Sequence, residues 1–223
     1  MAYFPFFVDL EGKKCLIAGG GIVAYRKVLV LMEYGPQITV VAPQFHPELP
    51  LLKKELGGKL ILLDRKFQDS DLEDADFVIA GTSEEELNRH ISLLCKAKNI
   101  PINVVDVQEE CSFIFPALIK EKHITVAIST GGDSPTIAKY LKGKFKEAIP
   151  DGFGDLAEQL GSYRDLVKEK VDLISIRTDI FQTMVEEGIR QGGVFTREQA
   201  EELIERKLLE HEGKSHTNRN QEK

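Results

Sequence analysis

The sequence predicts an α/β fold: a parallel, doubly wound sheet, then a small α+β domain and a C-terminal helical domain. Short apolar runs alternate with amphipathic helical segments over about the first hundred residues. After Asp106 two apolar runs are joined only by the polar link 120–123, which is typical of a hairpin. From Gly152 onward the pattern is helical. We therefore expect domains at 1–112, 113–150 and 151–210, with 211–223, which is poor in apolar residues, as a disordered tail.

The first domain contains apolar runs of strand length at 15–18, 38–42, 60–63, 77–80 and 102–105. Helical patterns lie between them at 22–34 and 47–56, with a helical turn at 69–76. A fourth helix should open at a capping box, Ser83 to Glu86. Strands and helices in this order give right-handed crossovers, so the carboxyl ends of the strands gather at one edge of the sheet.

The second domain should pair strands at 113–119 and 124–128, followed by a helix that begins at Pro135 with Ser134 as its N-cap. Helical spacing indicates that this helix turns a set of apolar residues inward: Ile137, Leu141, Phe145 and Ile149. Another capping box, Thr196 to Gln199, should start the last helix, which runs through Leu208.

A glycine-rich turn follows the first strand directly, in the segment KCLIAGGGIVAYRK (14–27). The turn and the helix start after it consist of Gly19, Gly20, Gly21, Ile22 and Val23. Glycines permit a sharp turn and a close approach to a pyrophosphate, and a helix N-terminus attracts an anion. Ala24 stands at the third glycine position, where alanine is accepted. The segment predicts a dinucleotide site, although such turns also occur without a ligand.

The acidic residue that normally holds the ribose 2′-hydroxyl, about twenty positions further on, is missing after the second strand. No Lys or Arg stands there to favour a 2′-phosphate. We therefore expect the ribose to be held by backbone groups or by Gln44, next to Pro43. The loop that contains Thr82 should reach the same edge of the sheet.

Asp106 leaves the fifth strand at that edge, where a carboxylate could accept a proton from a substrate. The alternative is that Asp106 only caps the following loop. A second anion-binding loop is indicated at 129–134, ahead of a capped helix. The segment from Lys120 to Lys146 contains six lysines and two acidic residues, and this surplus of four positive charges favours a polyanionic substrate. A solvated helix face is the other interpretation.

Composition disfavours several classes of function. The net charge of −7 and pI near 5.4 disfavour nucleic acid and acidic membranes as partners. No segment is long and apolar enough to span a membrane, and the N-terminus does not resemble a signal peptide. Three cysteines without metal-like spacing indicate reduced thiols in the cytoplasm.

Several other polar residues are interpreted as ordinary surface or turn residues, namely His90, His123, Arg26 and Lys27. No metal site is predicted.

Four motifs in order carry a resemblance to a known family. They are FPFFVDLEGKKCLIAGGGIVAYRK, VVAP at the second strand, NVVD with SFIFPALI behind it, and VAISTGGDSPTIAKYL. Over roughly 3–149 the chain resembles the NAD-dependent precorrin-2 dehydrogenases of the siroheme-synthase N-terminal type, often also sirohydrochlorin ferrochelatases. The region after Gly152 is similar only loosely. The family shares the VVAP-like strand end that lacks the ribose acid.

The resemblance implies a Rossmann-like NAD-binding domain, a central dimerisation domain and a helical domain in an intertwined homodimer. It also implies oxidation of the tetrapyrrole precorrin-2 to sirohydrochlorin with hydride transfer to NAD⁺, and in some members Fe²⁺ insertion. The general base of the family falls on Asp106, and its cofactor loops on 19–23, Pro43 and Gln44. The residues expected to contact the eight carboxylates of the substrate are Asn103, Ser112, Thr130, Gly131, Ser134 and Lys139.

Two other functions fit the first domain. A regulatory module that binds a nucleotide without chemistry would not need Asp106 or the 129–134 loop. An NAD-linked reductase with a smaller substrate would leave the lysine surplus unexplained.

Overall fold

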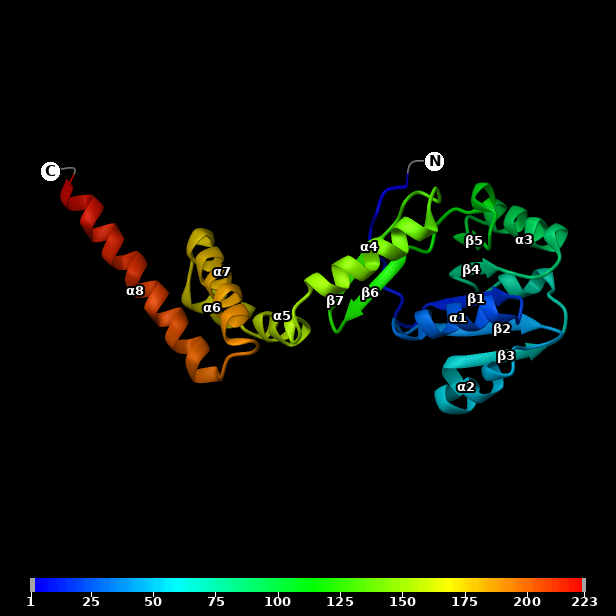
Figure 1. Cartoon of the computed structure of the whole chain (residues 1–223), viewed down its shortest axis with the longest axis horizontal. Coiled ribbons are helices and arrows are strands. Elements are labelled where there is room, and N and C mark those ends of the chain that lie inside the picture. Colours follow the sequence, from blue (N-terminus) through cyan, green and yellow to red (C-terminus); the bar gives the residue numbers. More distant parts are fainter. Residues whose placement is uncertain (1–2, 222–223) are drawn as a thin grey trace. The chain divides into compact units, whose positions relative to one another are not determined.

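The computed structural model describes residues 3–221, with side chains described as far as His211, in two compact units that divide between Phe115 and Pro116 (Figure 1). The first unit holds a parallel sheet in the order β3-β2-β1-β4-β5. Its strands are β1 (Lys14–Ala18), β2 (Gln37–Ala42), β3 (Leu60–Asp64), β4 (Phe77–Ala80) and β5 (Ile102–Val104). The predicted parallel α/β sheet is confirmed, and the strand order reverses between β1 and β4.

Helices cover both faces of this sheet. They are α1 (Ile22–Met32), α2 (Glu48–Leu56) and α3 (Glu85–Ala97), with short 3₁₀ turns η1 (Gly57–Lys59), η2 (Asp69–Leu72) and η3 (Gln108–Glu110). Successive strand side chains point to opposite faces. Cys15 and Ile17 of β1 therefore pack with α1 and α2, whereas Leu16 and Ala18 pack with α3. Strands β1, β2, β4 and β5 are mostly buried on both sides, which explains their nearly continuous apolar sequences, whereas the edge strand β3 is partly exposed.

The capping box predicted at Ser83 to Glu86 is wrong. Helix α3 begins at Glu85 after an N-cap residue, Glu84, that makes no side-chain cap hydrogen bond. The hydroxyl oxygen of Thr82 instead accepts a hydrogen bond from the Glu84 N–H (3.1 Å). The segment before α3 is thus organised by Thr82, one residue upstream of the predicted cap.

The second unit begins with an antiparallel hairpin of β6 (Ala117–Glu121) and β7 (Ile124–Ile128), as predicted. Strand β6 starts four residues later than the predicted boundary at 113, because Phe113 and Phe115 pack against the core of the first unit. Helix α4 (Pro135–Ala148) follows, and its predicted N-cap is confirmed by a hydrogen bond from the Ile137 N–H to Ser134 Oγ (3.3 Å).

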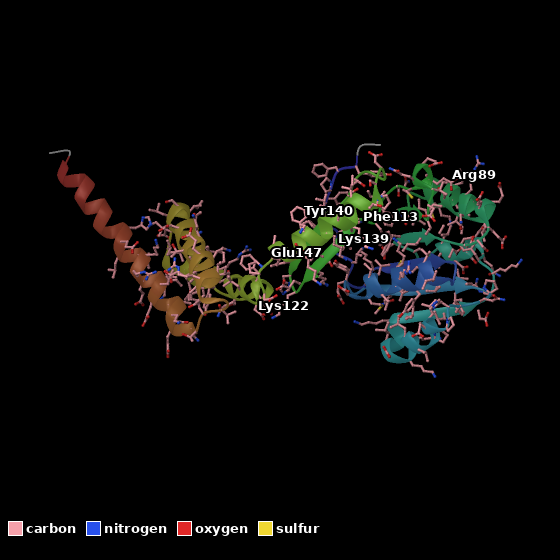
Figure 2. The ribbon with its side chains drawn as sticks, in the orientation of Figure 1. Arg89, Phe113, Lys122, Lys139, Tyr140 and Glu147 are labelled. Atoms are coloured by element: carbon pink, nitrogen blue, oxygen red, sulfur yellow. The ribbon has the colours of Figure 1, made fainter. Side chains whose placement is uncertain are left out.

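The apolar residues predicted to face inward on α4 do not all do so. Ile137 and Phe145 are 53% and 48% exposed, and among the described residues of this helix only Ala138 is buried. The cause is that the packing partner of α4 within its own unit is a two-stranded hairpin, which is too small to cover the apolar face. Figure 2 labels Lys139, Tyr140 and Glu147 along the same helix.

The remaining helices are α5 (Phe153–Ser162), α6 (Arg164–Lys170), α7 (Ile174–Gln191) and α8 (Arg197–Gln221). They share a core that includes Leu156, Ile180 and Met184. The predicted capping box of the last helix is confirmed, since Thr196 and Gln199 exchange hydrogen bonds between side chain and backbone.

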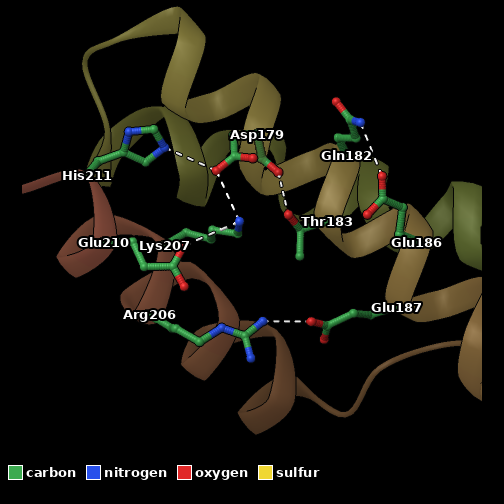
Figure 3. A network of polar contacts seen from close by, with 9 residues as sticks. All are labelled: Asp179, Gln182, Thr183, Glu186, Glu187, Arg206, Lys207, Glu210 and His211. Carbon is green, nitrogen blue, oxygen red and sulfur yellow. Dashed lines mark hydrogen bonds and ion pairs between the residues drawn. The ribbon is translucent and has the colours of Figure 1, made fainter. Parts of the chain in front are cut away.

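Polar contacts join α7 to α8 (Figure 3), where Asp179 binds both Lys207 (3.2 Å) and His211 (3.1 Å). These contacts hold the pKa of the Asp179 carboxyl below its usual range. Helix α8 continues to Gln221, which differs from the tail predicted at 211–223. Extending a helix that has already started costs less than starting one, which accounts for this continuation. Residues 222 and 223 lie outside the described part of the chain.

Candidate functional site

The glycine turn after β1 is packed so tightly that its first two positions admit no side chain. Gly19 has φ +113°, and a Cβ there would lie 2.4 Å from the Gly81 carbonyl oxygen. At Gly20 a Cβ would lie 2.2 Å from the Gln44 carbonyl oxygen. Both neighbours are backbone atoms of other loops. The turn therefore joins the loops that follow β2 and β4 at the edge where the strand order reverses.

Gly21 is different, because nothing lies within 4 Å of the position its Cβ would take. It is the N-cap of α1, it makes no side-chain cap hydrogen bond, and the first turn of α1 has no acidic residue. The N–H groups at the start of α1 therefore keep their partial positive charge, with no side-chain cap and no acidic residue of the first turn to offset it. Ala24 is buried against the sheet. These features fit a dinucleotide pyrophosphate at Gly21, Ile22 and Val23.

The loop after β2 lies against this turn. The His46 N–H donates to the Gly20 carbonyl oxygen (2.7 Å), and the His46 ring stacks on Tyr25 of α1 with the ring centroids 5.0 Å apart. Pro43 and Gln44, predicted to contact the cofactor, are exposed on the same loop. Sequence reasoning did not find the contact between Tyr25 and His46, since no local pattern relates the two residues.

Thr82 is held in the loop after β4 by Asn88 of α3. The Asn88 side-chain oxygen accepts from the Thr82 N–H (3.0 Å) and from the Thr82 hydroxyl (2.8 Å), and the Asn88 amide group donates to the Thr82 carbonyl oxygen (3.0 Å). Asn88 is only 7% exposed. Sequence reasoning missed Asn88, although its spacing of three residues before Ile91 and seven before Cys95 places it on the buried face of α3 and could have found it.

Asp106 follows β5 at the same edge of the sheet. It is exposed and has φ +62°, in the left-handed region that Asp tolerates better than most residues. The Val105 N–H donates to the Ala80 carbonyl oxygen (2.9 Å), which ties the end of β5 to β4. The carboxyl group thus stands on a rigid turn in the same unit as the glycine turn.

Asn103 and Ser112, predicted to bind substrate, anchor the segment behind Asp106. Asn103 is buried, and its side-chain amide donates to the Phe113 carbonyl oxygen (3.1 Å). Ser112 Oγ accepts from the Ile102 N–H (2.8 Å), and the Ser112 N–H donates to the Ile102 carbonyl oxygen (2.8 Å). These contacts hold residues 111–113 along β5.

The predicted anion loop lies in the second unit, before α4. The Thr130 hydroxyl oxygen accepts from the Ser134 N–H (3.1 Å), and Ser129 Oγ accepts from the Gly131 N–H (3.0 Å). The structure therefore brings Thr130, Gly131 and Ser134 together in one loop. Lys139 is exposed on α4.

Lys27 of α1 is partly buried, so its interpretation as an ordinary surface residue is wrong. Its Nζ lies 3.5 Å from the centroid of the Phe115 ring, a cation–π contact. Burial lowers the pKa of Lys27 to about 8, and the charges of Cys111 and Asp106 partly oppose that fall. Helical spacing could have revealed this environment, because Lys27 stands three residues after the buried Ala24 and four before the buried Leu31.

Two other features are absent from the described part of the chain. No three of the His, Cys, Asp and Glu side chains in 3–211 gather as ligands for a metal ion. Within the part of the chain that the structure covers, no helix combines the length and the apolar character needed to cross a membrane.

Curated relatives cover most of this chain. It is 39% identical over 210 residues to the siroheme synthase of Thioalkalivibrio sulfidiphilus, with 94% of this chain and 42% of that protein covered. It is also 39% identical over 212 residues to the siroheme synthase of Pseudomonas paraeruginosa, with 93% of this chain and 44% of that protein covered. The predicted resemblance is confirmed, and the chain spans less than half the length of these relatives.

A solved structure described as "SirC, precorrin-2 dehydrogenase" matches the fold with a TM-score of 0.74 at 21% identity, covering 92% of this chain and 98% of that one. A family model described as "Putative NAD(P)-binding" matches residues 6–117, half of the chain and nearly the whole first unit. This is the region in which the open N-terminus of α1, the glycine turn and the Thr82 loop meet. The chain belongs to this NAD(P)-binding family.

Proposed function

We propose that the chain oxidises precorrin-2 to sirohydrochlorin with NAD⁺ as hydride acceptor. The carrying observation is that the glycine turn, the uncapped α1 N-terminus and Asp106 lie at one edge of one sheet. The identities of 39% with siroheme synthases support the choice of substrate. Three free cysteines suit a reducing compartment, which supports the cytoplasm as the place of reaction.

The reaction removes two hydrogens from the substrate, one as hydride and one as a proton. NAD⁺ when bound accepts the hydride. Gly21, Ile22 and Val23 bind its pyrophosphate through backbone N–H groups. Thr82, Pro43 and Gln44 contact the rest of the cofactor, at its ribose or its nicotinamide half. Asp106 accepts the proton, a role typically worth about 10²–10⁴ in rate.

Cationic and N–H groups of the second unit would bind the substrate carboxylates. Thr130, Gly131 and Ser134 supply the loop, and Lys139 stands one turn into α4. Asn103 and Ser112 act by holding the segment beside Asp106, because their side chains already bond to backbone groups. Lysines along α4 add positive potential for a molecule with eight carboxylates.

The proposal includes a homodimer in which residues 113–150 form the dimerisation domain and 151–210 the helical domain. Ile137, Tyr140 and Phe145 support it, since they expose 53%, 64% and 48% of their surface on α4. An apolar face of this kind is typical of an interface between subunits. A second copy of α4 is the partner that would bury it.

Turnover distinguishes this enzyme from a nucleotide-binding regulator. Precorrin-2 and NAD⁺ are mixed anaerobically with the protein, and NADH is followed at its absorbance maximum. Asp106→Asn is expected to lose nearly all turnover and to keep NAD⁺ binding. An inactive wild-type protein would refute the proposed reaction, and a fully active Asp106→Asn variant would remove Asp106 from it.

Fe²⁺ insertion into sirohydrochlorin is a finer point of the same proposal, since Asp106 could accept the pyrrole protons as well. Sirohydrochlorin and Fe²⁺ are incubated anaerobically with wild-type protein and with Asp106→Asn. Siroheme formation above the rate without protein would support the second activity, and a rate equal to that control would refute it.

A further inference from the structure

We propose that Tyr25 and His46 are positioning residues. Their stacked rings fix the loop after β2, so that the backbone of this loop can hold the adenosine ribose of NAD⁺ without an acidic side chain. The inference rests on the proposed function, which places NAD⁺ at the glycine turn. It assigns a role to a contact that the sequence did not indicate.

The loop after β2 is attached to the glycine turn through its backbone. The Gly19 N–H donates to the Val41 carbonyl oxygen (3.0 Å), and the His46 N–H donates to the Gly20 carbonyl oxygen (2.7 Å). The Gln44 carbonyl oxygen occupies the space that a side chain at Gly20 would need. The segment 41–46 is therefore fixed at both of its ends to the turn that would bind the pyrophosphate.

The two rings add a third attachment, between side chains. They lie 5.0 Å apart between centroids, with an angle of 11° between their planes. The Tyr25 N–H donates to the carbonyl oxygen of Gly21, the N-cap of α1 (3.1 Å), so the Tyr25 ring belongs to the first turn of that helix. The stack therefore ties His46 and its loop to the helix end that carries the uncapped N–H groups.

The segment between these attachments has donors that the protein leaves unused. Within the described residues, the N–H groups of Gln44 and Phe45 donate to no other protein group. No Asp or Glu stands between Ala42 and Pro47 to bind a ribose hydroxyl. A backbone group binds a hydroxyl well only where the chain is already in place, because ordering a loop on binding costs conformational entropy. The stack supplies this order before the cofactor arrives.

The variants must separate loss of the stack from loss of core packing, because Tyr25 also packs against the core of the first unit. Tyr25→Leu keeps an apolar side chain but removes the ring, and Tyr25→Phe keeps the ring. His46→Ala removes the other ring and leaves the backbone N–H. Met32→Ala, at the far end of α1 and packed against the same core, is the control for core packing.

The order of the loop is measured first without ligand, as hydrogen exchange of the His46 N–H by NMR in the full chain. The Ile17 N–H in β1 reports any general loss of stability. Losing an aromatic pair corresponds to about a fivefold change in an equilibrium, so the His46 N–H should exchange about fivefold faster, relative to Ile17, in Tyr25→Leu. Tyr25→Phe and Met32→Ala should keep the wild-type ratio. An unchanged ratio in Tyr25→Leu would overturn the proposal.

Calorimetry then compares NAD⁺ with the analogue that lacks the 2′-hydroxyl of the adenosine ribose. The wild type should bind NAD⁺ roughly tenfold more tightly than the analogue, because the analogue loses a hydrogen bond to the loop. Tyr25→Leu and His46→Ala should bind NAD⁺ about five- to tenfold more weakly than the wild type and the analogue almost equally well, because a displaced loop makes no use of the hydroxyl. Tyr25→Phe should keep the preference for NAD⁺.

The two affinities separate the outcomes. If the ring variants weaken NAD⁺ and the analogue by the same factor, the stack only supports the fold and the inference fails. A wild type that binds NAD⁺ and the analogue equally would also overturn it, because the loop would not hold this ribose. If the wild type binds neither, the proposed function fails. Hydrogen exchange at His46 would still decide whether the stack orders the loop, so the two failures are distinguishable.

Discussion

Single alanine substitutions in the glycine turn should separate folding from cofactor binding. In Gly21→Ala the new methyl group meets no protein atom within 4 Å, and φ is −77°, which any residue adopts. Alanine is a weaker N-cap than glycine, but it also restricts the unfolded chain, so we expect the free energy of unfolding to change by less than about 1 kcal/mol. The methyl group stands where the pyrophosphate approaches the backbone, and NAD⁺ affinity should fall at least about tenfold.

Gly19→Ala and Gly20→Ala should behave in the opposite way. At Gly19 the left-handed φ of +113° costs an alanine roughly 1–3 kcal/mol, and overlap with the Gly81 carbonyl oxygen adds about as much again. At Gly20 the overlap is with the Gln44 carbonyl oxygen at 2.2 Å, a backbone atom that moves only with its loop. Both variants should lose about 2–5 kcal/mol of stability before any effect on the ligand is considered.

Urea denaturation followed by circular dichroism measures the stabilities, and isothermal titration calorimetry measures NAD⁺ affinity. Gly58→Ala serves as a control, because a Cβ at Gly58 also meets open space and lies away from the turn. Unchanged NAD⁺ affinity in a folded Gly21→Ala protein would refute the assignment of the phosphate site. Full stability of Gly19→Ala would refute the close packing of the turn.

Three further predictions concern stability and assembly. Lys27→Met should raise the free energy of unfolding at pH 7 by about 1–2 kcal/mol. The fall in the Lys27 pKa from 10.5 to about 8 represents a cost of ~3 kcal/mol for the buried ammonium, and the variant recovers only part of it because it also loses the cation–π contact. Wild-type stability should rise between pH 8 and 10.5, where the unfolded state binds the extra proton, and Lys27→Met should lack that rise in urea melts. Asn88→Leu removes three hydrogen bonds to Thr82, so the free energy of unfolding measured by urea denaturation should fall by about 2–3 kcal/mol. Calorimetry should also show weaker NAD⁺ binding. A stable variant with normal affinity would contradict the role of Asn88. Phe145→Glu on α4 should yield monomers in analytical ultracentrifugation while Lys142→Glu, also exposed on α4, stays dimeric; equal sedimentation of the two would count against the α4 interface.

Much of the fold could be predicted from local patterns. The five parallel strands of the first unit, the hairpin and the Ser134 cap depend on periodicity and on the conformations that Gly, Ser and Pro favour, and these are properties of neighbouring residues. The boundary of β6 was misplaced for the opposite reason. Phe113 and Phe115 look like strand residues, but their packing partners lie in the first unit.

The candidate site divides in the same way. The sequence indicated the glycine turn, Thr82 and Asp106 because they stand directly after strands whose order was readable. It did not indicate Asn88, whose role depends on a loop six residues away in the chain and on burial within a helix face. The inward orientation expected for Ile137 and Phe145 was wrong, because helical spacing identifies an apolar face but not the size of the surface that covers it.

The sequence by itself determined the order of the elements and the place of the phosphate turn, since both depend on backbone preferences and on spacing along a short segment. Only the tertiary structure decided which groups share an environment. Lys27 and Phe115 are far apart in the chain, yet the two side chains are in contact, and burial there lowers the pKa of the amine to about 8. Burial and Coulomb interactions act through space between folded segments, and no local pattern contains them.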